Sequence, residues 1–337
     1  MSRFRGANNE GVLVLVLVVL VIGMSLANPA FFSVSTLFAV LRSSIVPLVL
    51  ALGVLIVIIS GGIDVSFAAI AVFAAYSTVL LTATDPLGLG IVGAVLCALA
   101  IGALLGLVNG VVISRFRLPT LIVTLGTQGI FRGVLLTYVG AAYVANLPGP
   151  LAALSTVDIV ETTVGGRRVS LTAMVVAPVL LCLLVAWVLR RTMFGRAVYA
   201  IGGDPEAARR AGFRVARTQM VVYVVVGMMA AAGGLIFMIM GRSASPQDLV
   251  GGELDIIAAV VLGGASIFGG RGSVLGTALG VLLVQVINNS LILAGVPSAW
   301  QRTAVGLLLI VGVGVQALAA RRSATTVHAH DEEGVPA

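Results

Sequence analysis

The sequence predicts an all-α integral membrane protein, a polytopic helical bundle of about ten transmembrane helices. Three observations support this fold class. Hydrophobic residues make up 59% of the chain and charged residues only 10%, with a mean hydropathy of +1.15. The apolar residues fall in long runs that glycine, proline or arginine interrupt. The arginines flank these runs at alternate ends, which is the positive-inside arrangement of membrane proteins.

The apolar runs give the expected spans. The eighth run has about 13 residues and is the weakest, because a helical crossing needs roughly 20 residues. An interfacial lead-in is expected at 31–43, and an extracytoplasmic connection at 140–170. The expected spans cover about 12–27, 45–60, 67–82, 91–114, 120–139, 171–189, 219–240, 256–268, 273–293 and 302–319.

The arginine pattern also predicts the orientation of the chain. Ten spans with both termini in the cytoplasm satisfy the placement of the arginines. The transmembrane domain is expected to cover 1–322, and the polar tail at 323–337 is expected to be disordered. Because the arginines flank the spans in this arrangement, the net charge of +7 is no sign of nucleic-acid binding.

A basic loop at 190–218 interrupts the apolar pattern, and its seven arginines place it in the cytoplasm. Asp204 suits a helix N-cap, and Pro205 suits the first helical position. Glu206 adds negative charge where the helix dipole favours it, and Gly212 suits the C-terminal stop. Such a short helix is unstable alone. We therefore expect it to rest on other elements and to dock onto a cytoplasmic partner.

The same loop resembles a known family. Glu206-Ala207-Ala208, followed by Gly212, is similar to the EAA coupling motif of ABC-importer permeases, although the Ile-x-Leu-Pro ending of that motif is absent. The run from Tyr199 to Ala208 looks like the ribose and autoinducer-2 type of sugar permease. The resemblance covers about Ser33 to Ala319, and it implies that the loop docks in a cleft of an ATP-binding subunit. The coupling residues would be Tyr199, Gly202, Gly203, Asp204, Pro205, Glu206, Ala207, Ala208, Arg209 and Gly212. A capped helix without a partner is the alternative.

The chain does not itself carry an ATPase site. A P-loop needs a lysine to contact the β and γ phosphates, and all 20 basic residues of the chain are arginine. Both histidines, His328 and His330, lie in the polar tail, so the spans lack the side chains of a typical catalytic site. We predict no cofactor and no catalytic or metal site in this chain, with ATP bound by a partner subunit.

A break in the apolar pattern is the first candidate for a solute path. Gly61-Gly62-Ile63-Asp64-Val65-Ser66 is similar to the Gly-Gly-Ile-Asp-Leu-Ser hallmark of the same family. An unwound backbone at membrane depth must face protein or water, and Asp64 is too costly to face lipid. Direct contact with solute and a structural turn that caps the third helix are equally open.

Two polar stripes are further candidates. Thr120, Thr124, Thr127, Gln128 and Arg132 recur at helical spacing along the fifth span. Such groups suit a hydroxylated solute, and hydrogen bonding between helices is the alternative. The ninth span carries a similar group. The candidate path residues are Gly61, Gly62, Asp64, Ser66, Thr124, Gln128, Arg132, Gln285, Asn288 and Asn289.

Two glycine triplets with four-residue spacing raise the possibility of an inverted repeat, as in many transporters. Glycine ridges of this kind let helices approach closely in lipid. The triplets lie 170 residues apart, and Gly61-Gly62 precedes Gly233-Gly234 by 172 residues. The triplets are Gly102, Gly106 and Gly110, and Gly272, Gly276 and Gly280.

The sequence thus predicts the permease subunit of a bacterial ABC importer in the cytoplasmic (inner) membrane. The resemblance implies three partners: an ABC ATPase, an extracytoplasmic solute-binding protein, and a second copy of the chain or a paralogous permease. It also implies a sugar or sugar-like solute. A branched-chain amino-acid permease of the same superfamily is one alternative. An ion-coupled transporter is another, and it would need intramembrane ionisable groups, of which Asp64 is the obvious example.

Overall fold

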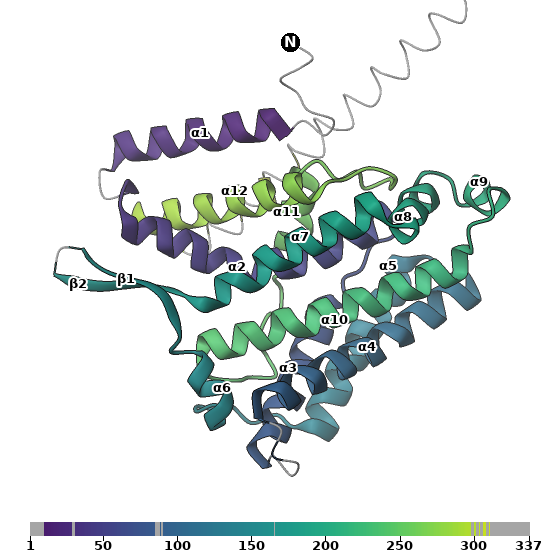
Figure 1. Ribbon diagram of the computed structural model, residues 1–337, viewed down its shortest axis with the longest axis horizontal. Helices are drawn as coiled ribbons and strands as arrows, with labels where there is room; N and C mark the ends of the chain where they lie inside the picture. The colour runs from purple at the N-terminus through teal and green to yellow at the C-terminus, as the bar shows by residue number, and fades with distance from the viewer. Residues whose placement is uncertain are drawn as a thin grey trace, which may run out of the picture.

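The computed structural model describes residues 10–28, 31–84, 88, 90–164, 166–297, and residues 300, 303, 306, 307 and 310. Within these residues the protein is a bundle of long helices with one β-hairpin (Figure 1). Seven helical segments there are long and apolar enough to cross a membrane. This confirms a polytopic all-α membrane protein, and the total of about ten spans stays a prediction. The seven are Val34–Ile59, Phe67–Thr84, Gly90–Phe116, Thr120–Val139, Ala173–Arg191, Val215–Gly241 and Val274–Leu293.

The elements follow one another with short connections. The tenth expected span and the polar tail fall outside the described residues, apart from isolated positions of the span, so both remain predictions. The elements are α1 (Glu10–Ala27), α2 (Val34–Ile59), α3 (Phe67–Thr84), α4 (Gly90–Phe116), α5 (Thr120–Val134), the π-helical turn η3 (Leu135–Val139), α6 (Gly149–Leu154), β1 (Asp158–Val164), β2 (Arg167–Thr172), the 3-10 turn η4 (Ala173–Val175), α7 (Val176–Arg191), α8 (Met193–Gly203), α9 (Pro205–Arg210), α10 (Val215–Gly241), α11 (Glu253–Leu262) and α12 (Val274–Leu293).

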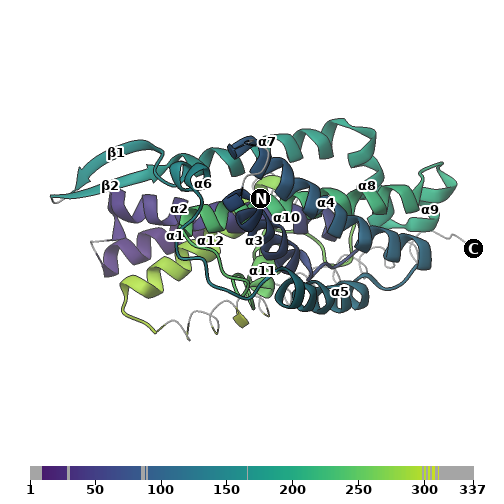
Figure 2. The ribbon, with the colours of Figure 1, turned by 90° about the horizontal axis from the view of Figure 1, so that it is seen from below.

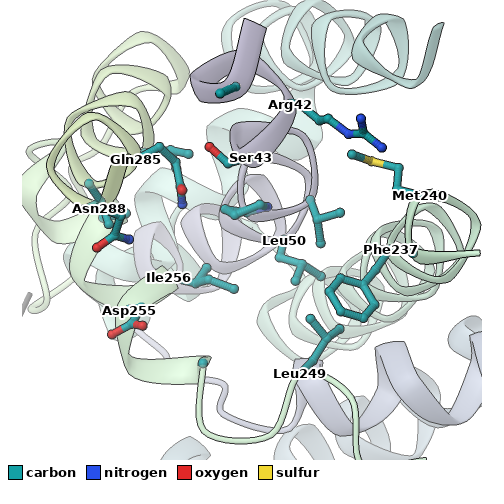
Figure 3. Close-up of a pocket in the computed structure, with 18 residues that line it drawn as sticks. Arg42, Ser43, Leu50, Phe237, Met240, Leu249, Asp255, Ile256, Gln285 and Asn288 are labelled. Carbon is teal, nitrogen blue, oxygen red and sulfur yellow. The ribbon is translucent and has the colours of Figure 1, made fainter. Parts of the chain in front are cut away.

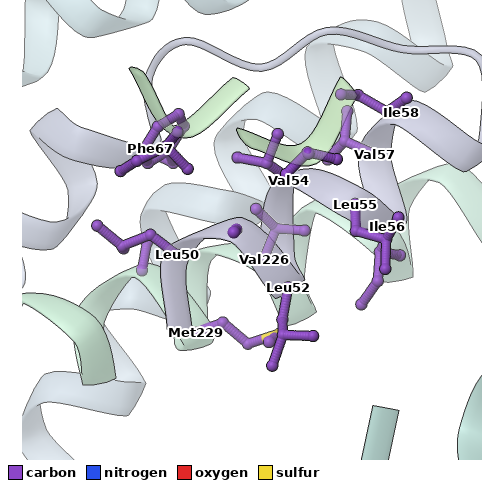
Figure 4. Packing of buried hydrophobic residues seen from close by; sticks show 14 of the residues in the cluster. Leu50, Leu52, Val54, Leu55, Ile56, Val57, Ile58, Phe67, Val226 and Met229 are labelled. Carbon is purple, nitrogen blue, oxygen red and sulfur yellow. The ribbon is translucent and has the colours of Figure 1, made fainter. Parts of the chain in front are cut away.

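Helix α2 forms the centre of the bundle. Almost all of its residues after Ser43 are buried, and they pack against α3, α10 and α12. Figure 4 shows Leu50 and Leu52 beside Val226 and Met229 of α10, and Phe67 at the start of α3. A helix that is apolar all round is the expected sequence for such a position.

Two expected boundaries were wrong. The lead-in at 31–43 and the second span are a single helix, α2, which Ser33 caps and which runs through Pro47. The eighth expected span is shorter and begins earlier than predicted: α11 has only ten residues, fewer than the roughly 20 of a helical crossing. Gly263 is the C-cap of this helix. The next residue, Gly264, has a φ of +90°, which suits a glycine that leaves a helix.

The glycine triplets do mark close helix contacts. On α4, a Cβ at Gly102 or Gly106 would collide with backbone of α10 near Gly227. On α12, a Cβ at Gly276 would collide with the Gly263 carbonyl oxygen at the end of α11. The pairing of Gly61-Gly62 with Gly233-Gly234 gains no support, because the first pair lies in a turn and the second inside α10. The inverted repeat stays a prediction.

The connection at 140–170, expected outside the cytoplasm, contains α6 and a hairpin that the sequence did not predict. Strands β1 and β2 pair antiparallel, with an irregularity between Asp158 and Val160. The hairpin projects from one end of the bundle, and α8 and α9 lie at the other end (Figures 1 and 2). The molecule therefore has two distinct ends, as a chain that spans a membrane requires.

Candidate functional site

The predicted short helix is present, and its caps are those that the sequence indicates. It is α9, and the Asp204 carboxylate accepts hydrogen bonds from the backbone N–H groups of Glu206 and Ala207 at 2.8 and 3.1 Å. These bonds, that from Ala207 first, hold the pKa of Asp204 below its usual range. At the other end Gly212 has a φ of +90°. The Phe213 N–H donates to the Ala208 carbonyl, which completes a Schellman stop.

Helices α8 and α9 together form a small unit, which we call the knob (residues 193–212). Its anchor is Ala208, which is buried among Ala197, Ile201 and Val215. The outward face of α9 is exposed, and a Glu206–Arg209 ion pair lies on it. The knob thus combines a fixed apolar base with a free polar surface. The exposed residues of α9 and its cap are Asp204, Pro205, Glu206, Ala207, Arg209 and Arg210.

The other predicted coupling residues lie on the inner side of the knob. The Tyr199 hydroxyl donates to the Gly272 carbonyl at 2.8 Å, and burial raises the pKa of this tyrosine. Gly202 is buried against the end of α2, and the neighbouring Gly203 is exposed. Tyr199 and Gly202 therefore face the bundle, whereas Gly203 and the exposed residues of α9 do not.

The break after α2 is held by side chains from α4 and α5. The buried Asp64 carboxylate accepts from the Ser66 N–H and hydroxyl, both at 2.7 Å. Asn109 of α4 donates to the same hydroxyl at 2.8 Å. From α5, Thr120 accepts from the Ile63 N–H at 2.9 Å. The arrangement is that of a fixed turn at the start of α3, which favours the structural alternative for Asp64.

The polar stripe of α5 is also bonded within the protein. Arg132 forms an ion pair with Glu253 at 2.6 Å, and Gln128 donates to the same carboxylate oxygen at 2.9 Å. Thr124 contacts the break, donating to the Ile63 carbonyl and accepting from the Val65 N–H, both at 3.3 Å. Glu253 falls between the expected spans at 219–240 and 256–268, and the sequence did not predict this partner. The ion pair satisfies the requirement that an arginine in a span be paired.

A cavity of about 610 Å³ lies between four helices (Figure 3). Ser43 of α2 and Gln285 and Asn288 of α12 lie on one side, and the apolar Phe237 and Met240 of α10 lie on the other side, where Arg42 lies beside Met240. The sequence predicted Gln285 and Asn288 and missed other polar lining residues. The third predicted residue of α12, Asn289, instead donates to the Ser43 hydroxyl at 3.1 Å and to the Gln285 carbonyl at 2.8 Å. The polar lining residues that the sequence missed are Arg42, Ser43 and Asp255.

The cavity lies far from the knob along the bundle. Helix α10 begins beside α9 and lines the cavity with its last residues, Phe237, Met240 and Gly241, about 30 Å further along its axis. The molecule therefore presents a polar surface at one end and a mixed polar and apolar cavity toward the other.

A protein-family model described as the branched-chain amino acid transport system permease component matches residues 36–313. The chain belongs to this permease family. The match covers every helix from α3 to α12 and all but the first two residues of α2, so the knob and the cavity both lie within the family's shared region.

The chain is also similar to individual curated proteins over most of its length. The autoinducer 2 import system permease protein LsrC of Enterobacter sp. (strain 638) is 36% identical over 308 residues, which cover 89% of this chain and 84% of the relative. LsrC of Yersinia pseudotuberculosis serotype O:3 (strain YPIII) is 32% identical over 310 residues, covering 92% and 85%. LsrC of Yersinia pestis (strain Pestoides F) is 31% identical with the same coverage. No solved structure matches the chain significantly.

Membership in this permease family settles the general role of the chain. The protein is the permease subunit of an ABC importer, a transporter component and not an enzyme, and ATP is hydrolysed in a separate subunit. Its partners are an ATPase and a solute-binding protein, and it crosses the bacterial inner membrane several times.

Proposed function

We propose that this permease imports a sugar-like solute of the chemical class of autoinducer 2, and that the ATPase binds the knob. The observation that supports the proposal is the structure of the knob. Its base is buried on α8 and α10, and its capped helix presents an exposed charged face. A short helix that is stabilised from below can transmit force to its support and leave its surface free for a partner.

The cavity supports the choice of solute. Amide and hydroxyl groups on one wall suit the hydroxyl groups of a small polar solute, and the apolar wall suits its carbon skeleton. The relatives named above are permeases of autoinducer 2 import systems. In this proposal Gln285 and Asn288 line the path. Gly61, Gly62, Asp64, Ser66, Thr124, Gln128, Arg132 and Asn289 position its walls.

The proposal also includes the assembly. The functional unit pairs this chain with a second copy or a paralogous permease, and both termini face the cytoplasm with the knob. The density of arginines around the knob supports this orientation, since basic residues favour the cytoplasmic side.

The first test disrupts the docking face of the knob. Glu206→Arg with Ala207→Arg replaces two exposed residues and leaves the buried Ala208 unchanged. The permease is expressed with its ATPase, and co-purification from detergent-solubilised membranes is measured. We expect association to fall by about ten-fold or more, since like charges and bulk at an interface cost several kcal/mol. Insertion and thermal stability of the permease should stay unchanged.

A control likewise introduces two exposed arginines, one of them in place of a glutamate, at the other end of the molecule. Glu161→Arg with Thr163→Arg alters two exposed residues of β1 and should leave association with the ATPase intact. If the knob variant binds the ATPase as well as this control does, the knob is not the docking site. The solute is tested separately with proteoliposomes that hold the full complex. Uptake of leucine in preference to autoinducer 2 and ribose would contradict the proposed solute class.

A further inference from the structure

Four glycines from three distant parts of the chain meet on the inner side of the knob. They are Gly61 after α2, Gly202 at the end of α8, and Gly269 and Gly270 in the turn between α11 and α12. We call this contact the glycine junction. Gly61, Gly269 and Gly270 have φ values of +81°, +87° and +71°, which glycine adopts without strain.

The junction is too tight for a side chain. A Cβ atom on Gly202 would collide with the Ile59 carbonyl oxygen and would lie 2.7 Å from the Gly270 nitrogen. A Cβ on Gly269 would lie 2.8 Å from the Gly61 Cα. The Gly270 N–H donates to the Ile59 carbonyl at 2.9 Å, so α2 and the turn are also hydrogen-bonded to each other. Backbone meets backbone here, and packed backbone transmits displacement with little give.

The elements that meet at the junction also form the cavity. Helix α2 ends at the junction and lines the cavity with residues between Ala39 and Leu50. The turn at 263–272 joins α11 to α12, and both of these helices line the cavity as well. A displacement of α8 therefore reaches three of the four helical walls directly. The fourth wall, α10, also packs against α8 and α9.

We propose that the glycine junction is the link through which movement of the knob opens and closes the cavity, with Gly202 and Tyr199 as its positioning residues. This inference rests on the proposed function, because it takes the knob as the docking site and the cavity as the solute path. Gly202 presses on α2 and the turn at once. Tyr199 ties α8 to the same turn through the Gly272 carbonyl.

The test compares two glycines that lie within helices. Gly202→Ala adds a methyl group inside the junction, and Gly23→Ala adds the same group to an exposed position of α1 where no described atom lies within 4 Å. The complete complex of permease, ATPase and binding protein is reconstituted in proteoliposomes. Uptake of autoinducer 2 and ATP hydrolysis are then measured together. We expect Gly202→Ala to bind the ATPase and to hydrolyse ATP, but to import about ten-fold less solute per ATP. Gly23→Ala should match the unaltered chain.

A milder variant keeps the proposal testable if Gly202→Ala fails to insert. Tyr199→Phe removes a single hydrogen bond at almost constant volume, and we expect it to lower the solute imported per ATP by about three-fold. Tyr143→Phe, an exposed tyrosine, is its control.

The outcomes separate the two proposals. Suppose that the unaltered complex imports autoinducer 2, and that Tyr199→Phe and any folded Gly202→Ala import as much solute per ATP. The junction then does not link movement of the knob to the cavity. If the unaltered complex itself imports neither autoinducer 2 nor ribose, the proposed function fails first.

Discussion

Helices α5 and α12 carry similar polar stripes, yet the structure uses the two stripes differently. On α5, Gln128 and Arg132 bond to the Glu253 carboxylate, and Thr124 bonds to the break after α2. On α12, Gln285 and Asn288 face the cavity. Threonine, glutamine, asparagine and arginine at helical spacing therefore do not by themselves indicate a solute path.

The element that lies opposite each stripe decides its role. The stripe of α5 faces backbone groups of the break and an acid at the start of α11, and both need partners when they are buried. The stripe of α12 faces a hollow between helices, so two of its amides keep bonding capacity for a solute. Gln285 and Asn288 both line the cavity, and the buried amide oxygen of Asn288 has no hydrogen-bond partner among the described residues. The comparison predicts stability effects on α5 and transport effects on α12.

The largest effect is expected from the ion pair between α5 and α11. Arg132→Ala leaves Glu253, whose side chain is only 10% exposed, without its counter-charge. Removing one partner of a buried pair is strongly destabilising, and we expect a loss of about 3 kcal/mol in the free energy of unfolding. Thermal unfolding of the purified permease in detergent measures it. Glu253→Gln in the Arg132→Ala background should recover much of the loss.

An exposed ion pair of the hairpin is the control for this prediction. Arg168 and Glu161 lie 3.9 Å apart with side chains 82% and 55% exposed, so Arg168→Ala should cost less than about 0.5 kcal/mol. If Arg132→Ala unfolds like this control but abolishes uptake, the α5 stripe lines the path and the comparison is wrong.

The opposite pattern is expected on α12. Gln285→Leu and Asn288→Leu remove hydrogen-bonding groups from the polar wall of the cavity, and each should lower uptake by about ten-fold, as loss of a solute contact does. Thermal unfolding should be almost unchanged, because the replaced amides face the cavity. Uptake into proteoliposomes at several solute concentrations measures the effect. Asn289→Leu is the matched control on the same helix, since Asn289 bonds to Ser43. It should affect stability more than uptake.

The knob could be predicted because its signals are local. Asp204, Pro205 and Gly212 lie within nine residues of one another, and the rules of capping need only neighbouring residues. The sequence indicated that the short helix rests on other elements, but it did not indicate which residue anchors the helix. Ala208 belongs to the motif and yet is buried, which only the fold reveals.

The cavity and the junction could be predicted only in part, because they depend on distant contacts. Arg42 was assigned to an interfacial segment at 31–43, whereas it lies within α2, which continues to Ile59. Glu253 was assigned to a loop, although it begins α11. Gly61, Gly202 and Gly269 all appear in the sequence as plain turn or helix-end glycines. Their mutual contact depends on the packing of three segments that no local pattern relates.

The smallest effect is expected at Thr124 of the α5 stripe. Thr124→Val removes two long hydrogen bonds to the break, to the Val65 N–H and the Ile63 carbonyl, and should cost about 1 kcal/mol of stability. Thr127→Val is the matched control, since its hydroxyl donates within its own helix to the Thr124 carbonyl. We expect the control to change stability by less than about 0.5 kcal/mol, because its bond stays inside one helix. Thermal unfolding and uptake are measured side by side for both variants. A Thr124→Val permease with unchanged stability but reduced uptake would mean that the break contacts solute. The structural role of the α5 stripe would then be limited to Gln128 and Arg132.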